Sequence, residues 1–165
     1  MSTTTLLQSL FRQKAAINEE FFAVLDTVAA GDRVDAIRLM NHIHVVDKIF
    51  AAHLRGEPHG FAATNTPETP TLDALRAAVR ETDRWFIGHA GALTPVQLAE
   101  TVAFTFTDGQ HGRMSREEML AHVITHGSYH RGEVGRMLKH LSVAPPRDLF
   151  TAWLHQSEPQ RRVRA

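Results

Sequence analysis

Three histidines recur at every fourth position in the segment AHVITHGSYHRGEV, which spans residues 121–134. Imidazole nitrogen is a common ligand of divalent metal ions, so the spacing of His122, His126 and His130 suggests metal chemistry. On a helix, His126 and His130 lie on one side, about 6 Å apart along the axis, and could bind one ion together. His122 shares their face but lies about 12 Å from His130, which is too far for all three to bind the same ion. A further ligand must come from another part of the chain.

Two more histidines stand close together in NHIHVVDKIF, residues 41–50. A helical wheel places His42 and His44 about 200° apart, so we expect only one of them to face the protein interior. His42 shares its side with apolar residues, whereas His44 lies on a more mixed face. The neighbours of His42 are Leu39, Val45, Val46 and Ile49, and those of His44 are Met40, Asp47, Lys48 and Ala51. We therefore predict that His42, His126 and His130 bind one ion and leave a coordination position open, which is typical of catalytic rather than structural zinc.

A pair of histidines four residues apart on a helix is often incidental, so spacing alone does not establish a metal site. Two further observations favour one: an inward-facing histidine on another predicted helix, and a chain with 11 histidines but no cysteine. Without cysteine, the available metal ligands are histidine and carboxylate side chains. We interpret the remaining histidines as ordinary surface or core residues. They are His44, His53, His59, His89, His111, His140 and His155.

Apolar residues recur at helical spacing through most of the chain and predict an all-α helix bundle. The last long helix begins at a capping box, in which Ser115 is followed three residues later by Glu118, and it ends before Pro145. The expected long helices cover residues 4–28, 33–55, 71–93 and 115–141.

The predicted helices are joined by a long connection and a small hairpin. Residues 56–70 are rich in Gly, Pro, Thr and Asn, which is typical of an irregular connection. TVAFTFTDGQHGRM alternates β-prone residues around Asp108 and Gly109, and it predicts a small β-hairpin directly before the last long helix. Near the C-terminus, RDLFTAWLHQ predicts one short helix and RRVRA a frayed basic tail.

Length and composition indicate a single domain without a charged partner. The chain has 165 residues, 43% of them hydrophobic, so we expect one bundle domain over 1–165, with a core over 5–141 and a C-terminal extension over 142–165. Lys plus Arg and Asp plus Glu each number 18, so no net charge attracts nucleic acid. No stretch approaches the roughly 20 apolar residues that span a bilayer, and no signal segment begins the chain. We therefore expect a cytoplasmic protein that binds neither nucleic acid nor membrane.

The segment around the three histidines resembles the last long helix of a known protein family. EEMLAHVITHGSYHRGEVGRML contains the H-G-x-x-H-R-G signature of the DNA-damage-inducible DinB family of four-helix metalloenzymes, and NHIHVVDKIFAAHL resembles the second helix of that family. With the hairpin, the resemblance covers most of residues 5–141. Carried over by position, it implies the metal ligands His42, His126 and His130, the three residues that the helical wheels select.

The resemblance also implies a fold and a range of functions. The fold is an up-down-down-up four-helix bundle, frequently a homodimer, that holds a divalent ion such as zinc or nickel. Related branches include S-transferases and isomerases that use low-molecular-weight thiols, and a metal-bound water could instead hydrolyse a substrate. A metal-dependent enzyme of the stress response is thus one hypothesis. The alternative is a non-catalytic metal-binding or dimeric interaction protein, in which the ion only ties two helices together.

Glu133 is the position at which the chain departs from the family pattern, because the family usually has Gln there. This carboxylate lies near the direction of His126 and could accept a hydrogen bond from a ligand histidine, act as a general base, or bind the ion itself. It could also be a surface carboxylate paired with Arg136 or Lys139. Glu133 and His122 are therefore the candidates for a catalytic role, and we expect His122 to lie beside the site without binding the ion.

Overall fold

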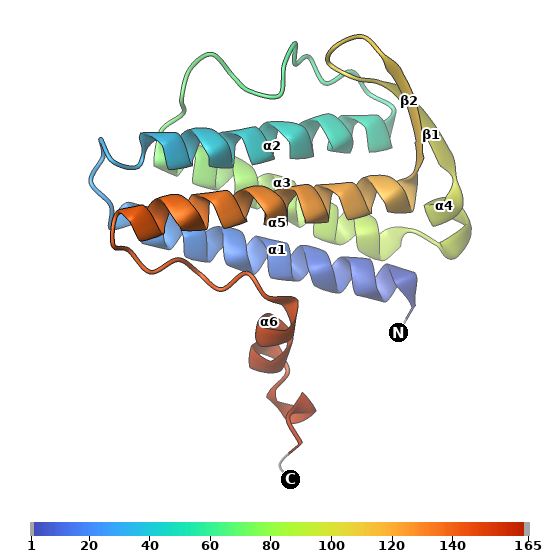
Figure 1. Cartoon of the computed structure of the whole chain (residues 1–165). Helices are drawn as coiled ribbons and strands as arrows, with labels where there is room; N and C mark the ends of the chain where they lie inside the picture. The colour runs from blue at the N-terminus through green and yellow to red at the C-terminus, as the bar shows by residue number, and fades with distance from the viewer. Residues whose placement is uncertain (1, 164–165) are drawn as a thin grey trace.

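The computed structural model describes residues 2–163 and contains four long helices (Figure 1). They are α1 (Thr3–Asp26), α2 (Val34–Arg55), α3 (Leu72–Ala92) and α5 (Arg116–His140). Following the chain in Figure 1, α2 and α3 run in the same direction, opposite to α1 and α5, which is the up-down-down-up order. Because α2 and α3 are parallel, the connection over residues 56–71 must return along the whole bundle, and this explains its length.

Each long helix has two neighbours in the bundle. The closest pairs are α1 with α3 and α2 with α5, and weaker contacts of α2 with α3 and of α1 with α5 complete the arrangement. Helix α2 is therefore covered on two sides, by α5 and by α3 (Figure 1). The α2–α5 pair brings together the two segments that carry the predicted metal ligands.

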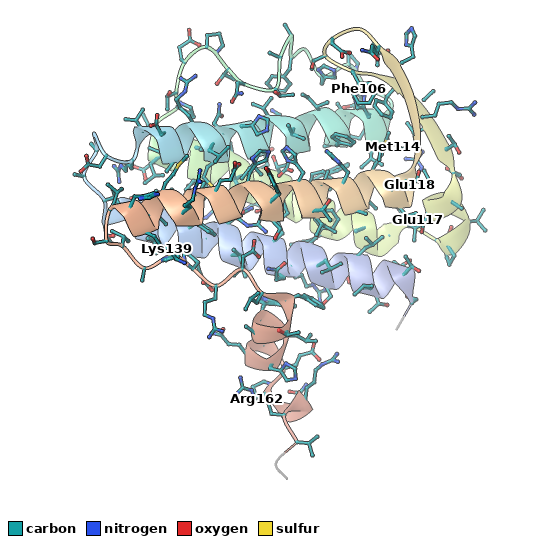
Figure 2. All side chains as sticks on the ribbon, viewed as in Figure 1. Phe106, Met114, Glu117, Glu118, Lys139 and Arg162 are labelled. Carbon is teal, nitrogen blue, oxygen red and sulfur yellow. The ribbon has the colours of Figure 1, made fainter. Side chains whose placement is uncertain are left out.

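Local sequence signals set the ends of the helices. Ser115 accepts a hydrogen bond from the backbone N–H of Glu118, whose side chain accepts one from the Ser115 N–H, so the predicted capping box that begins α5 is confirmed. Two acidic residues occupy the first turn of α5, and Lys139 lies in its last turn, at the opposite end (Figure 2). This arrangement complements the helix dipole. Gly56 ends α2 in the left-handed conformation, with φ of 70°.

A two-stranded hairpin lies at one end of the bundle, as predicted (Figure 1). Strand β1 (Thr101–Thr105) pairs antiparallel with β2 (His111–Ser115), and Gly109 in the turn has φ of 86°. The short helix α4 (Pro95–Ala99) precedes the hairpin, and Phe104 anchors β1 in the core.

The chain ends in an extension that leaves the bundle (Figure 1). It contains the predicted short helix as α6 (Phe150–Ser157), followed by a 3₁₀ turn, η1 (Pro159–Arg161). Of the basic tail predicted to be frayed, residues 164 and 165 lie outside the described part of the chain. None of the described helices combines the length and apolar character that a bilayer crossing requires.

The buried apolar side chains form two clusters rather than one continuous core. One cluster surrounds Phe21 and Phe22, and the other surrounds Phe11 and Phe86 near the hairpin. Several buried polar or charged side chains complete the interior of the bundle. They are Gln13, Lys14, Asn18, Asn41, His44, Asp47, Asp83 and Arg131.

Candidate metal centre

The side chains of His42, His126 and His130 converge between α2 and α5. Each offers one ring nitrogen, and these three atoms lie within 4.8 Å of one another. The Nε2 atoms of His42 and His126 are 3.2 Å apart. In a tetrahedral zinc site with bonds of about 2.0–2.1 Å, two nitrogens lie about 3.3 Å apart, so this separation matches an edge of such a site. The three residues are thus positioned to bind one metal ion.

Hydrogen bonds at Nδ1 orient two of the imidazoles and place a proton on that ring nitrogen. The Nδ1–H of His42 donates to the carbonyl oxygen of Thr64 at 2.9 Å, and the Nδ1–H of His130 donates to the Glu133 carboxylate at 2.5 Å. With the proton held on Nδ1, each Nε2 keeps its lone pair for an ion. Thr64 belongs to the connection, and sequence reasoning missed it because the acceptor is a backbone atom.

The electrostatics of the site favour the neutral form of two of its imidazoles, those of His126 and His42. Burial, followed by the charges of His130, His42, His122 and Lys14, lowers the pKa of His126 to about 3. Burial also lowers the pKa of His42. Because a metal binds the neutral imidazole, both shifts reduce competition from protons.

Glu133 makes the contact that we expected of a supporting acceptor. Its carboxylate binds His130, and no ion pair joins it to Arg136 or Lys139 among the described residues. Among the described residues, the group of converging ligands contains only the three histidines, and Glu133 does not belong to it. Its roles as a general base or as a determinant of metal affinity stay predictions.

His122 lies beside the site and outside the ligand group. Its ring stacks on Phe50, with the ring centroids 4.5 Å apart, and lies 5.4 Å from the ring of His126. Burial lowers its pKa. Two more histidines extend the row of aromatic rings toward the hairpin, because His53 lies 5.3 Å from His59 and 5.0 Å from Phe104 between ring centroids.

The expectation that only one of His42 and His44 faces the interior was wrong. His44 is 8% exposed and is more buried than His42. A single wheel assumes one buried face, whereas α2 packs on α5 with one side and on α3 with the other. Burial, followed by Lys48 and Lys14, lowers the pKa of His44 to about 4, so it is neutral near pH 7.

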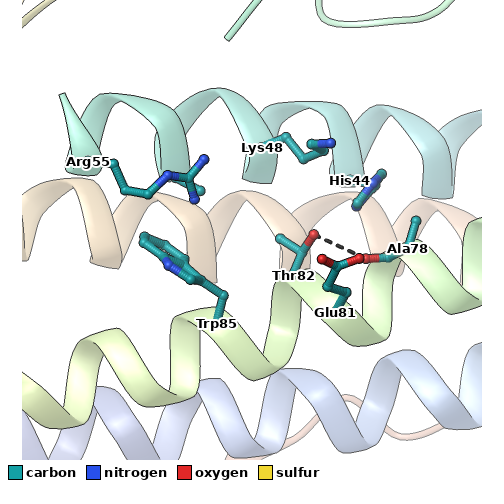
Figure 3. Close-up of a pocket in the computed structure, with 8 residues that line it drawn as sticks. His44, Lys48, Arg55, Ala78, Glu81, Thr82 and Trp85 are labelled. Carbon is teal, nitrogen blue, oxygen red and sulfur yellow. Dashed lines mark hydrogen bonds between the residues drawn. The ribbon is translucent and has the colours of Figure 1, made fainter. Parts of the chain in front are cut away.

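His44 lines a small cavity of about 210 Å³ between α2 and α3, which contains none of the converging histidines (Figure 3). Ala51 and Ala78 leave space there, and longer polar side chains surround it. The lining residues are His44, Lys48, Ala51, Arg55, Ala78, Glu81, Thr82 and Trp85. The cavity is therefore separate from the metal site.

A depression of about 470 Å³ opens beside the converging histidines. Its walls come from α2, α5 and the connection, and two of the three converging histidines, His42 and His130, line it. The complete lining is Asp35, Arg38, Leu39, His42, Asn65, His130, Glu133 and Met137. An ion bound by the three histidine nitrogens would have a free coordination position at which a small molecule could bind.

Three threonines hold the connection against α2 along this wall. Two of them accept hydrogen bonds through their hydroxyls, and the third through its backbone carbonyl. The pairs are Arg38 with Thr69 at 3.0 Å, Asn41 with Thr66 at 2.6 Å, and His42 with Thr64 at 2.9 Å. The threonine content of the connection was visible in the sequence, but its contact with α2 was not.

A buried cluster of charged side chains lies next to α5, the helix that carries His126 and His130. Sequence reasoning missed this cluster as well. Lys14 of α1 is fully buried and lies 2.6 Å from Asp47 of α2 and 2.8 Å from Asp83 of α3. A side chain at Gly127, next to a ligand histidine, would meet Lys14 Cε at 3.3 Å and Arg131 Nη1 at 3.0 Å. The available signal was a lysine three residues after Phe11 and three before Ile17, within an apolar row.

The up-down-down-up bundle has three histidines that converge between its second and last long helices and could hold a metal ion. These features define a class of helical, metal-associated proteins. The chain belongs to the DinB family, whose family model matches residues 1–162, nearly the whole chain. The match confirms the resemblance drawn from the two histidine-containing segments. No curated protein matches this chain, so no curated relative suggests a substrate.

Proposed function

We propose that this protein is a divalent-metal-dependent enzyme whose ion, zinc or nickel, is held by His42, His126 and His130. The observation that carries the proposal is the convergence of three ring nitrogens within 4.8 Å, with two imidazoles anchored through Nδ1. An incidental cluster of histidines would not require acceptors that leave the inward nitrogens unprotonated.

The proposed reaction is transfer to a low-molecular-weight thiol or hydrolysis of a small substrate. When bound, the ion would act as a Lewis acid that lowers the pKa of a thiol or of water. The chain itself orients His130 through Glu133 and His42 through the Thr64 carbonyl. The depression beside the histidines admits a small molecule from solvent. A cytoplasmic homodimer that acts in the stress response fits this proposal.

A second candidate is a non-catalytic protein in which the ion ties two helices together. The observation that favours it is the origin of the ligands, because His42 lies on α2 whereas His126 and His130 lie on α5. An ion bound to both helices would stabilise the fold whether or not a substrate enters.

Metal analysis of the untagged protein and of two matched variants tests metal binding. We expect about one ion per chain in the parent, loss of the ion in His126→Ala, and retention in His122→Ala, which removes an imidazole from the same face of α5. Equal loss in both variants would show that His122 is a ligand. A parent that binds neither zinc nor nickel would contradict the proposal.

Thermal unfolding of the metal-loaded protein separates the two candidate functions. A panel of low-molecular-weight thiols should raise the unfolding temperature of the loaded protein and leave that of the metal-free protein unchanged. Stabilisation by metal alone, with no effect of any thiol and no hydrolysis in a substrate screen, would favour the non-catalytic candidate.

A further inference from the structure

Within the described part of the chain, the depression beside the converging histidines contains a cation that forms no ion pair with a carboxylate. Arg38 lines it from α2, one helical turn before His42. Among residues 2–163, the side-chain hydrogen bond of Arg38 goes to the hydroxyl of Thr69 at 3.0 Å, a neutral group. The exposed guanidinium is thus tethered by one hydrogen bond and keeps most of its donors for another ligand.

We infer that Arg38 binds a carboxylate of the substrate whose reacting group is held at the three histidines. The inference rests on the proposed function and adds a class of substrate to it. A guanidinium matches the two oxygens of a carboxylate, and its side chain lies on the same wall as His42. A molecule that spans the depression can therefore reach both groups at once.

The other lining residues narrow the substrate to a compact monocarboxylate. Leu39 and Met137 are partly buried and offer apolar contact to a short carbon chain between the two ends of the ligand. Asp35 and Glu133 also line the depression, and their carboxylates repel a ligand with several negative charges. A ligand with a single carboxylate beside Arg38 therefore suits these lining residues better than a phosphate, which carries more negative charge.

Two thiols that differ in one group provide the test. The protein is loaded with cobalt, and binding of 3-mercaptopropionate and of 2-mercaptoethanol is followed by the absorption band that a sulfur–cobalt bond produces. As each thiol binds, its S–H bond breaks, the sulfur donates an electron pair to cobalt and the proton passes to the buffer. The ratio of the two dissociation constants then measures the contribution of the carboxylate.

This ratio is compared between the parent, Arg38→Met and Arg84→Met. Arg84 is an exposed arginine of α3 that does not line the depression, so its variant is the matched control. We expect the preference for 3-mercaptopropionate to fall by about tenfold in Arg38→Met and to stay at the parental value in Arg84→Met. Arg38→Lys should recover only part of the preference. Lysine keeps the positive charge but lacks the planar guanidinium that can bind both oxygens of a carboxylate.

The outcomes distinguish this inference from the proposed function. A preference that is the same in the parent and in Arg38→Met, while cobalt and both thiols still bind, overturns the role of Arg38 and leaves the metal-dependent function standing. A parent that binds no cobalt overturns both. The absorption of bound cobalt without thiol shows whether Arg38→Met keeps an intact metal site.

Discussion

Two of the three converging imidazoles donate a hydrogen bond through Nδ1, and the third does not. His42 and His130 have acceptors for their Nδ1–H groups, whereas Nδ1 of His126 is buried without a hydrogen-bond partner among the described residues. The two anchors also differ, because one is a neutral carbonyl and the other is a carboxylate. The carboxylate makes His130 the stronger electron donor toward an ion.

Replacing Glu133 tests the importance of this negative charge. Glu133→Gln restores the residue that is usual in the family and keeps an acceptor for His130, but it removes the charge. We expect metal affinity to fall by about 10- to 100-fold, as measured by competition with a chromophoric chelator near neutral pH.

Glu117→Gln provides the control for Glu133→Gln. Glu117 is an exposed carboxylate in the first turn of the same helix, at the end next to the hairpin (Figure 2). Its replacement should leave metal affinity unchanged. Equal affinities of the parent and Glu133→Gln would mean that the hydrogen bond, and not the charge, supports His130.

At the scale of the elements, α2 is the long helix with the most buried residues among those described. It buries one face against α5 and another against α3, with His42 near the first and His44 on the second.

The burial of His44 links the stability of the protein to pH. The pKa of His44 is about 4 in the folded chain, below its ordinary value of 6.5. The unfolded chain therefore takes up a proton at a pH at which the folded chain does not.

The stabilisation from neutral His44 is fully present above pH 6.5 and is lost as the pH falls toward 4. From the size of this pKa shift, the loss in the free energy of unfolding is about 3 kcal/mol. Urea denaturation across this range should show a steeper loss of stability in the metal-free parent than in metal-free His44→Leu, which lacks the titrating group. Both proteins contain the other titrating groups, including His126 and Asp47. The difference between their stability curves therefore reports the contribution of His44. Parallel curves for the two proteins would contradict the prediction.

The sequence predicted the elements better than it predicted the contacts between them. The capping box at Ser115 and the Asp108–Gly109 turn are local signals, so the start of α5 and the hairpin followed from them. The second buried face of α2 was missed because a helical wheel does not say how many neighbours a helix has. The Thr64 carbonyl was missed because a backbone acceptor has no residue type by which to recognise it.

At the scale of the whole molecule, a buried ion cluster joins three of the four long helices. Burial acts to lower the pKa of Lys14, but Asp47 and Asp83 outweigh it and raise that pKa above 10.5. Burial raises the pKa of Asp47 to about 6, although Lys14 opposes the shift. The cluster continues through Asn18 to Arg131 of α5. Through Asn18, the hydrogen-bond network around this cluster thus extends to the fourth long helix.

Removing Lys14 should destabilise the protein more than removing an exposed lysine does. Lys14→Met leaves Asp47 and Asp83 buried without their cation, and breaking a buried pair in this way costs about 3–5 kcal/mol. Lys139→Met, at the exposed end of α5 (Figure 2), should change the free energy of unfolding by less than about 0.5 kcal/mol. Urea denaturation measures both. Similar values for the two variants would show that the cluster contributes no net stability.

The backbone carbonyl that orients His42 has a consequence for how this protein can change during evolution. Any amino acid at position 64 supplies the same carbonyl, so substitutions there leave the hydrogen bond intact. An insertion or deletion between the end of α2 and Thr64 would instead move a different carbonyl into place or none at all. The number of residues in this part of the connection, rather than their identity, is therefore the property that selection should preserve.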